Sequence, residues 1–337
     1  MTSQTLPAGK LRAETLDELL QHTSSDPNIL LGPAIGEDAA VVDFHGRYLV
    51  VSTDPITFAT DQCGWYAVWV NANDIAACGG TPRYFSASVV LPHGPTSLDD
   101  IKKLFMEIEQ ACQQLGILWI GGHTEISPTV TTPLVAGQMI GEVAPEELCR
   151  SADAQPGDAL VLVKTAAIEA TAIIAREKAR QVTAAFGRET TERCQRFLFE
   201  PGISIVAQAA MARGFAVHAM HDPTEGGVIT AIREICLASR CGVVVDEKAI
   251  QILPETAALC RHFNIDPLGA ISSGALLLTL AEENAARLLS HYQKHTVPAA
   301  VIGTMVPREN GMTLRKQDGK ITPLPLFDVD EIVKLFA

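Results

Sequence analysis

Three short stretches of the sequence place acidic residues beside small or polar ones, in a pattern that could hold a hard cation and phosphates. They are Gly36-Glu37-Asp38, Ser52-Thr53-Asp54 and Asn73-Asp74. Carboxylates on rigid elements suit Mg²⁺, which prefers oxygen ligands and keeps substrate phosphates in its coordination shell. An acid on the outer face of a helix is most often only solvated, so each stretch alone is a weak indication.

The elements around these acids can be read from the apolar pattern. The run Tyr48–Val51 predicts a buried strand that delivers Asp54 at its exit. Between residues 62 and 81, apolar residues recur at spacings of three and four, which predicts a helix with one narrow apolar stripe. Asp74 is expected almost opposite the centre of that stripe, with Asn73 on its flank.

A fourth stretch, Gly121-Gly122-His123-Thr124-Glu125, follows a short apolar strand expected over 117–120. Glycine at a strand exit lets the backbone approach a ligand closely. His123 and His221 each lie beside acids in glycine-containing loops, the context of a general base or a phosphate contact. A structural hydrogen-bonding role is an equal alternative for both histidines.

The rest of the pattern predicts two layered domains that meet between residues 144 and 158, where a turn of sequence Gln-Pro-Gly-Asp precedes an apolar run. We place the boundary between residues 150 and 151. Residues 6–10 are expected to form a mobile arm, followed by a helix over 15–21. The further predicted strands are 36–43, 84–91, 133–143, 159–163, 215–219, 242–245, 274–280, 299–304 and 311–315, and the further helices are 97–115, 168–180, 187–198, 203–212, 227–239, 254–263, 281–292 and 328–336.

Composition excludes several classes of protein. The chain has 337 residues, of which 47% are hydrophobic and 19% charged, enough for two globular domains with their own cores. The formal net charge of -13 argues against a general nucleic-acid binder. A phosphate ligand must therefore be held locally, by metal ions, backbone amides and a few placed Lys or Arg.

The cysteines and the N-terminal sequence indicate a reduced, cytoplasmic setting. The eight cysteines are scattered without a CxxC pair, so we expect small buried residues, Cys78 among them, and neither disulfides nor a zinc site. The first 20 residues show no signal-peptide pattern. No apolar run reaches the roughly 18 residues of a membrane helix. The common phosphate-loop, dinucleotide-loop and nucleophile-elbow motifs are also absent.

The ordered motifs together resemble one family, the aminoimidazole ribonucleotide (AIR) synthase-related superfamily. It includes AIR synthase, thiamine-monophosphate kinase, selenophosphate synthetase and the hydrogenase maturation protein HypE. The motifs are Gly-Glu-Asp-Ala-Ala-Val from Gly36, Ser-Thr-Asp from Ser52, Asn-Asp-Ile-Ala-Ala-Cys-Gly-Gly from Asn73, Gly-Gly-His-Thr-Glu from Gly121, Gln-Pro-Gly-Asp from Gln155, His-Asp-Pro-Thr-Glu-Gly-Gly from His221 and Ile-Ser-Ser-Gly-Ala from Ile271.

The resemblance implies a two-domain α+β and α/β protein that binds ATP and Mg²⁺. Residues 1–150 would form an ATP-binding and dimerisation domain and residues 151–337 an AIR synthase-like C-terminal domain. Carried over by motif, Asp38, Asp54 and Asp74 would bind metal and phosphate. Asn73, Gly121, Gly122 and Thr124 would complete the nucleotide site, and His123, Asp222 and Glu225 would face the substrate as catalytic candidates.

Three departures separate this chain from its relatives. His123 stands where relatives carry an acid after the paired glycines, which shifts metal binding to Glu125 or removes it there. The chain has no cysteine after Cys260, whereas HypE proteins carry the carbamoyl group on a tail thiol. Residues 164–171 lack the glycines that relatives use at a substrate phosphate, so a phosphate-bearing substrate is not expected.

The sequence therefore predicts a homodimeric, Mg-ATP-dependent protein nearest the HypE-like branch. It would transfer the γ-phosphate of ATP to a small carbonyl or amide-type acceptor. Two alternatives stay open: a small-molecule kinase similar to thiamine-monophosphate kinase, and a non-catalytic ATP-binding scaffold with a protein partner in a maturation complex. Neither nucleic acid nor membrane is expected as a partner.

Overall fold

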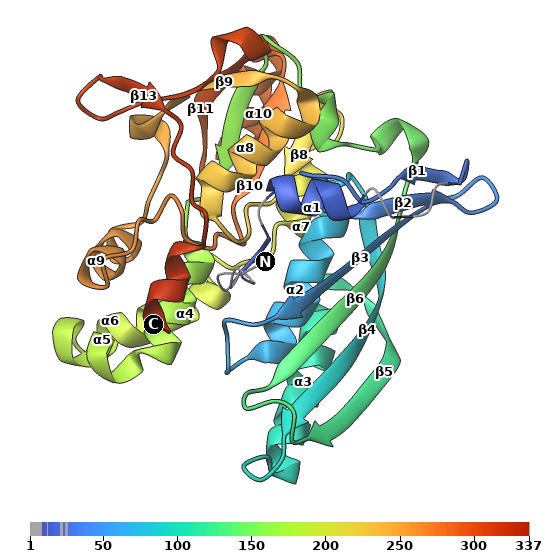
Figure 1. Cartoon of the computed structure of the whole chain (residues 1–337), viewed down its shortest axis with the longest axis vertical. Coiled ribbons are helices and arrows are strands. Elements are labelled where there is room, and N and C mark those ends of the chain that lie inside the picture. Colours follow the sequence, from blue (N-terminus) through green and yellow to red (C-terminus); the bar gives the residue numbers. More distant parts are fainter. Residues whose placement is uncertain (1–8, 12, 21–22, 24–25, 337) are drawn as a thin grey trace, which may run out of the picture.

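The computed structural model describes residues 9–11, 13–20, 23 and 26–336 of the chain. Two β-sheets organise it, and each is built from its own part of the sequence (Figure 1). Strands β1 to β6 form the first sheet and β7 to β13 the second. The predicted two-domain α+β fold is confirmed. The boundary between residues 150 and 151 stays a prediction, within a connection that holds two short 3₁₀ turns, Pro145–Glu147 and Ser151–Asp153.

The first sheet has the strand order β1-β2-β3-β6-β4-β5, with only the β4–β5 pair parallel among the described pairings. Helices α2 and α3 cover one of its faces (Figure 1). The elements are α1 Ala13–Leu20, β1 Ile29–Leu31, β2 Ala40–Asp43, β3 Tyr48–Ile56, α2 Cys63–Ala77, β4 Thr81–Pro92, α3 Leu98–Leu115, β5 Leu118–Ser127 and β6 Leu134–Val143.

The second sheet has the order β13-β12-β9-β11-β7-β10-β8, and strands β7 and β10 near its centre are buried throughout because both faces are covered. Its strands are β7 Ala159–Val163, β8 Val217–His221, β9 Gly242–Asp246, β10 Leu276–Leu280, β11 Ala299–Val306, β12 Met312–Arg315 and β13 Ile321–Pro323. Its helices are α4 Ile168–Glu177, α5 Ala179–Phe186, α6 Arg188–Gln195, α7 Val206–Ala212, α8 Gly227–Ser239, α9 Pro254–His262 and α10 Glu282–Lys294.

The C-terminal segment differs from the helix predicted over 328–336. Only a 3₁₀ turn, Glu331–Leu335, forms there, capped by the Asp330 side chain, which accepts from the Ile332 N–H at 2.7 Å. The turn lies beside α4 (Figure 1). Phe336 stacks on Phe58 of the first domain, with ring centroids 6.0 Å apart. The end of the chain thus helps to hold the two domains together.

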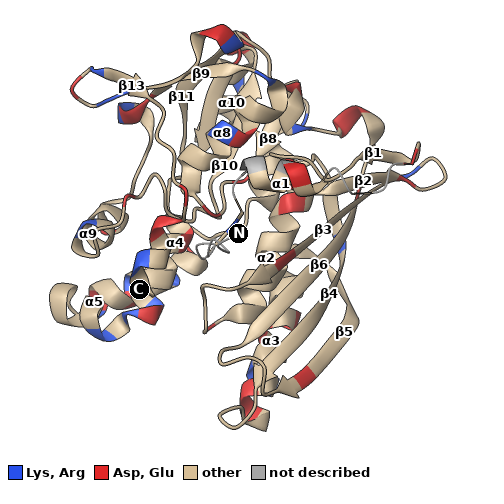
Figure 2. Ribbon diagram, in the orientation of Figure 1, with Lys and Arg blue, Asp and Glu red and all other residues tan. Residues whose placement is uncertain are grey.

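Several compositional expectations agree with the structure. All eight cysteines are buried and form no disulfide. None of the described helices is long and apolar enough to cross a membrane. Figure 2 shows Lys and Arg dispersed among acids, with no continuous basic stripe over the described ribbon.

Candidate active site between the domains

Four aspartates from both domains approach one another between the two sheets. Asp38 precedes β2, Asp54 lies on β3 and Asp74 on α2, while Asp222 follows β8 of the second domain. Asp74 is 4% exposed and Asp222 1% exposed. Carboxylates are rarely buried without a partner, so this grouping indicates a site rather than a solvated surface. We call these four residues the carboxylate centre.

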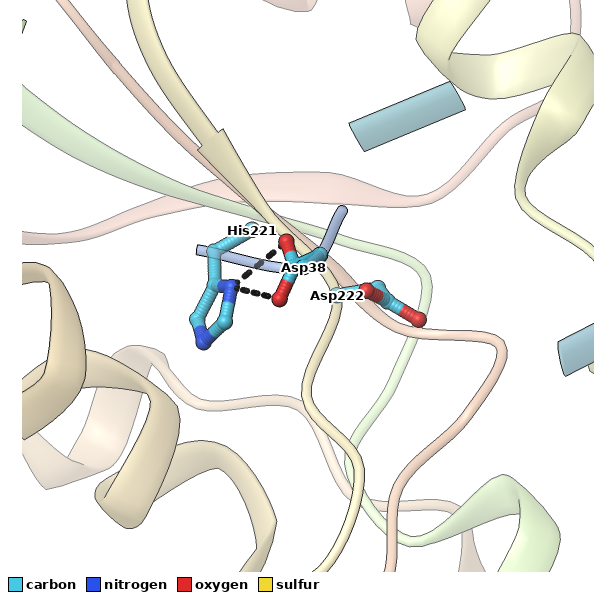
Figure 3. Close-up of side chains that lie close together, drawn as sticks. All are labelled: Asp38, His221 and Asp222. Atoms are coloured by element: carbon cyan, nitrogen blue, oxygen red, sulfur yellow. Dashed lines mark hydrogen bonds and ion pairs between the residues drawn. The ribbon is translucent and has the colours of Figure 1, made fainter. Parts of the chain in front are cut away.

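His221 joins the first domain to α8 at the edge of this centre. Its Nδ1 lies 2.7 Å from Asp38 Oδ2 (Figure 3), and its Nε2 lies 3.0 Å from Glu234 Oε2. Burial alone would lower the pKa of the imidazole, but Asp38 and Glu234 raise the pKa of His221 well above its ordinary value. The ring therefore acts as a buried cation that fixes the orientation of Asp38.

Gly36 allows the loop before β2 to lie against α8. Its φ is +77°, and a Cβ there would meet the backbone oxygen of Glu234 at 2.8 Å. Only glycine lets the loop before β2 lie so close to α8. The loop then carries Asp38 to His221.

Lys10, near the N-terminus, adds a further charged group to the Asp38–His221–Glu234 contacts. Its Nζ lies 2.8 Å from Glu234 Oε1, and its backbone N–H donates to Glu225 Oε2 at 2.8 Å. Although burial raises the pKa of Glu234, His221 and Lys10 lower it to about 2. Of the arm expected over residues 6–10, residues 6–8 lie outside the described part. Gly9 and Lys10 contact the second domain.

The carboxylate centre holds more acidic groups than nearby positive charges can balance. Both oxygens of Asp222 are buried and without a hydrogen-bond partner among the described residues. Burial and then the other aspartates raise the pKa of Asp74 and Asp222 well above the ordinary value. Burial raises the pKa of Asp54 to about 6, although Lys10 lowers it. Oxygen donors with unmet charge fit a hard divalent cation.

The distances between possible ligand atoms indicate where a cation would bind. Ligand atoms of Asp38, His221 and Asp222 lie within 4.8 Å of one another. Both ring nitrogens of His221 already face carboxylates, and both Asp38 oxygens lie against Nδ1, so the unpartnered oxygens of this group are those of Asp222, while Asp38 has further lone pairs to offer (Figure 3). Asp54 and Asp74 of the first domain lie near this group, since, in addition to burial, the charge of Asp54 raises the pKa of Asp222 and the charge of Asp222 raises the pKa of Asp74.

The prediction that a strand ends before Asp54 is wrong, because β3 continues to Ile56. Beyond Val51 the strand loses its β2 neighbour, and α2 takes that place. Asn71 of α2 accepts the Asp54 N–H at 2.8 Å and donates to the Asp54 carbonyl at 3.2 Å. This clamp, which the sequence did not indicate, holds Asp54 in position.

The expectation of a single narrow apolar stripe on α2 is also wrong. All but one of its residues are buried, Asp74 included, because the first sheet packs on one side and α7 and β8 on the other. Asn73 links the domains: it donates to the Ile203 carbonyl at 2.9 Å and accepts the Ile205 N–H at 2.8 Å. Its role as a nucleotide ligand stays a prediction.

The glycine-rich stretch predicted as a loop lies inside β5, paired with β4 at the edge of the first sheet. A Cβ on Gly122 would meet the Ala87 carbonyl oxygen at 2.0 Å, so glycine is required for the pairing itself. Strands β6 and β4 separate β5 from β3, so within one chain Gly121, Gly122, His123 and Thr124 do not join the carboxylate centre. The His123 side chain is 68% exposed and contacts Glu125.

The remaining predicted residues, Asp222 and Glu225, do lie at the interdomain site. A cavity of about 500 Å³ begins there, and Gly9, Lys10, Asp54 and Glu225 line it. Two supporting residues were not predicted. Glu234 carries the contacts given above, and Asp330 accepts the N–H groups of Gly226 and Ile271, which fixes the start of α8.

Two family models match the chain. The N-terminal domain of AIR synthase related protein matches residues 36–143, and its C-terminal domain matches residues 155–314. The chain belongs to the AIR synthase related family. Among curated proteins it is 30% identical over 286 residues to a carbamoyl dehydratase HypE of Rhizobium leguminosarum bv. viciae, covering 82% of this chain and 78% of that protein.

Solved structures of the family share the fold. A HypE–HypF complex matches with a TM-score of 0.72 at 20% identity, over 86% of this chain and 93% of the matched chain. HypE in complex with ATP matches with a TM-score of 0.67 at 22% identity, over 94% of this chain and 91% of that one. These structures confirm the fold, while the family models and the 30% identical relative confirm the predicted family membership.

Proposed function

We propose that this protein binds ATP with Mg²⁺ at the carboxylate centre and transfers the γ-phosphoryl group to a small carbonyl or amide-type acceptor. The observation that carries this proposal is the group of Asp38, Asp54, Asp74 and Asp222 beside an interdomain cavity, with Asp74 and Asp222 buried and both Asp222 oxygens without a hydrogen-bond partner among the described residues. The relatives support it, because a HypE structure contains ATP.

The donor set fits the proposed cofactor. Carboxylate oxygens are the ligands that Mg²⁺ prefers, and those of Asp222 have no other partner among the described residues. When bound, the ion would neutralise the charge of the phosphates. Asp38, Asp54, Asp74 and Asp222 would hold it, and the His221–Glu234 pair would keep Asp38 in place.

The phosphoryl group passes directly from ATP to the acceptor, so no covalent intermediate with the protein is needed. The acceptor oxygen forms a bond to the γ-phosphorus while the bond from that phosphorus to the bridging oxygen breaks, and ADP leaves with the bond's electron pair. Positioning and electrostatic stabilisation supply most of the acceleration in such reactions. The cavity beside the centre would hold the acceptor, and Lys10 on its wall, paired with Glu234, would add positive charge near the phosphates.

The two-domain division fits this assignment. We assign residues 1–150 to nucleotide binding and dimerisation and residues 151–337 to the acceptor side. Exposed apolar side chains on β4 and β5 suit a homodimer contact; they are Tyr84, Leu118, Ile120 and Ile126. Gly121, Gly122, His123 and Thr124 of one copy would then contact the nucleotide bound by the other.

A non-catalytic role is the second candidate, favoured by the similarity to the HypE chain of a HypE–HypF complex. In that role the protein would bind ATP in the cytoplasm and act as a scaffold for a maturation partner. Binding without turnover would be its signature, together with a protein partner recovered in pull-down.

Product analysis by ³¹P NMR separates these functions, using full-length protein, Mg-ATP and a primary amide as acceptor. We expect acceptor-dependent formation of ADP and free phosphate: after transfer, the carbon–oxygen bond of the phosphorylated acceptor breaks, phosphate leaves with the former amide oxygen and the bond's electron pair, and the amide nitrogen loses its protons to leave a dehydrated acceptor. Accumulation of a stable phosphorylated acceptor would instead indicate a kinase. Tight ATP binding without ADP formation for any carbonyl or amide acceptor would overturn the enzymatic proposal and favour the scaffold.

A further inference from the structure

The interdomain cavity extends beyond the carboxylate centre to a second polar site on the C-terminal domain. Its lining includes Glu169, at the start of α4, and Ser273, in the loop before β10. Apolar groups of both domains form the wall near these two residues; they include Ile56, Phe58, Ala59, Val70 and Ile271. No part of the proposed phosphoryl transfer has yet used Glu169 or Ser273.

These two polar side chains are built into the cavity wall. Glu169 is 3% exposed, and its Oε2 accepts the Ser273 N–H at 3.1 Å. Ser273 is 1% exposed, and its hydroxyl has no hydrogen-bond partner in the part of the chain that the structure describes. An unpaired buried polar group costs about 1–3 kcal/mol. A ligand in the cavity that pairs with the hydroxyl removes this cost.

The adjacent end of α4 is already occupied by the protein itself. A helix N-terminus normally offers free N–H groups to an anion. Here the Ala167 N–H donates to Ser272 Oγ at 2.6 Å, and the Ala170 N–H donates to the Ile271 carbonyl at 3.2 Å. The Glu169 carboxyl group stands in the first turn of the helix. Two donors at this end are therefore taken, and the Glu169 carboxyl group disfavours a phosphate or carboxylate there.

We propose that Glu169 and Ser273 recognise the acceptor and select a small, uncharged group that donates N–H or O–H hydrogen bonds. This inference rests on the proposed function, since it places the acceptor in the cavity that adjoins the nucleotide site. Glu169 accepts from the acceptor's donor group, and the Ser273 hydroxyl supplies a second hydrogen bond. The apolar wall contacts the acceptor's hydrocarbon part.

Charge explains the selection. An anionic acceptor would lie in a cavity whose wall carries three acidic side chains, Glu169, Asp54 and Glu225. Lys10 is the neighbouring cation on that wall, and it already pairs with Glu234. Like charges inside a partly dehydrated cavity repel one another more strongly than in water. A neutral donor group meets no such repulsion.

The test compares three probes of similar size: butyramide, butyrate and N,N-dimethylbutyramide. Their binding to full-length protein loaded with Mg²⁺ and a non-hydrolysable ATP analogue is followed by saturation-transfer NMR at pH 8, above the pKa of Glu169, which burial raises to about 7, so that its carboxyl group is charged. We expect the wild type to prefer butyramide over each of the other probes by about tenfold, the worth of one hydrogen bond or one repulsive contact.

Two variants and a control test whether Glu169 and Ser273 cause the preference for the amide. Glu169→Gln keeps an acceptor for the Ser273 N–H but removes the charge, so butyrate should bind within about threefold of butyramide. Ser273→Ala should weaken butyramide about fivefold while nucleotide affinity is unchanged. Glu283→Gln, on the exposed first turn of α10, removes the same charge far from the cavity and should behave as wild type.

Equal affinities of the wild type for the amide and the carboxylate would overturn the inference, and so would an unchanged preference in both variants. The nucleotide step separates this failure from that of the proposed function. Nucleotide binding without amide selectivity would contradict the acceptor assignment alone. A folded wild type that binds no nucleotide would overturn both.

Discussion

Lys10 and Glu234 form an ion pair, with Nζ 2.8 Å from Oε1, although 224 positions separate them in the sequence. The pair ties the segment before α1 to α8 of the second domain. Glu234 also contacts His221, which holds Asp38, so one continuous line of alternating charges reaches the carboxylate centre. The N-terminal segment is therefore part of the interdomain site.

Replacing Lys10 should cost stability beyond that of an ordinary surface pair. Lys10→Met leaves the largely buried Glu234 with His221 alone, so we expect a loss of about 1 kcal/mol, discounted for the water that screens the half-exposed ammonium. Lys102→Met is the control, since its pair with Asp99 is exposed. Thermal unfolding at low and high salt measures both. An equal effect of the two substitutions would contradict the role given to Lys10.

Asp330 should be indispensable for the start of α8. Its buried carboxyl group accepts N–H groups of Gly226, Ile271 and Ile332. Asp330→Ala leaves these donors unpaired, and we expect a loss of about 3 kcal/mol or more in urea unfolding. Asp318→Ala, at an exposed turn, is the control and should change stability little. A small loss for Asp330→Ala would mean that water replaces the carboxylate freely.

Glu169 should make stability fall between about pH 4.5 and pH 7. Burial raises the pKa of Glu169 from 4.5 to about 7, although neighbouring Ser273 lowers it. In this window the unfolded chain has lost the proton and the folded chain retains it, so raising the pH favours unfolding. The full effect is at most about 3 kcal/mol.

Glu169→Gln removes this titration. Relative to wild type, the variant should gain stability as the pH rises through this window and show a constant difference below about pH 4.5. Unfolding free energies at pH 4.5, 6 and 8 are compared with those of Glu283→Gln, which removes an exposed glutamate on α10. A difference between wild type and Glu169→Gln that does not change with pH would contradict the burial of an ionisable Glu169.

Neighbouring glycines of β5 allow a matched test of strand packing. Both have positive φ, but a Cβ on Gly122 would meet Ala87 backbone at 2.0 Å, whereas a Cβ on Gly121 has nothing within 4 Å. Gly122→Ala should therefore destabilise the protein by about 2 kcal/mol more than Gly121→Ala. Hydrogen exchange of β4 and β5 amides would report the loss. Equal effects would contradict the observed pairing.

The sequence predicted the fold and several acids because local patterns carry that information. The ordered motifs identified the family, and Asp38, Asp54 and Asp222 do lie at the interdomain site. Partners distant in sequence account for what was missed. Asp74 is buried by elements of the second domain, and Glu234 meets Lys10 and His221 only once α8 is docked. Neither contact leaves a periodic signal in the sequence.

The stretch around His123 was predicted wrongly for a different reason. Two glycines followed by polar residues are typical of a loop, and that prediction was made from local propensity alone. In the structure, pairing with β4 overrides the propensity and keeps the stretch extended. Its exposure at the sheet edge could be known only from the order of the strands.

The most direct test of the central claim is calorimetry of ATP binding with and without Mg²⁺, for wild type, Asp54→Asn and Asp74→Asn. Asp318→Asn controls for the loss of one surface charge. We predict binding that requires Mg²⁺ and weakens at least about tenfold in both site variants, with the control unchanged. Mg²⁺-independent binding, site variants that bind as the wild type does, or no binding by folded wild-type protein would contradict the account.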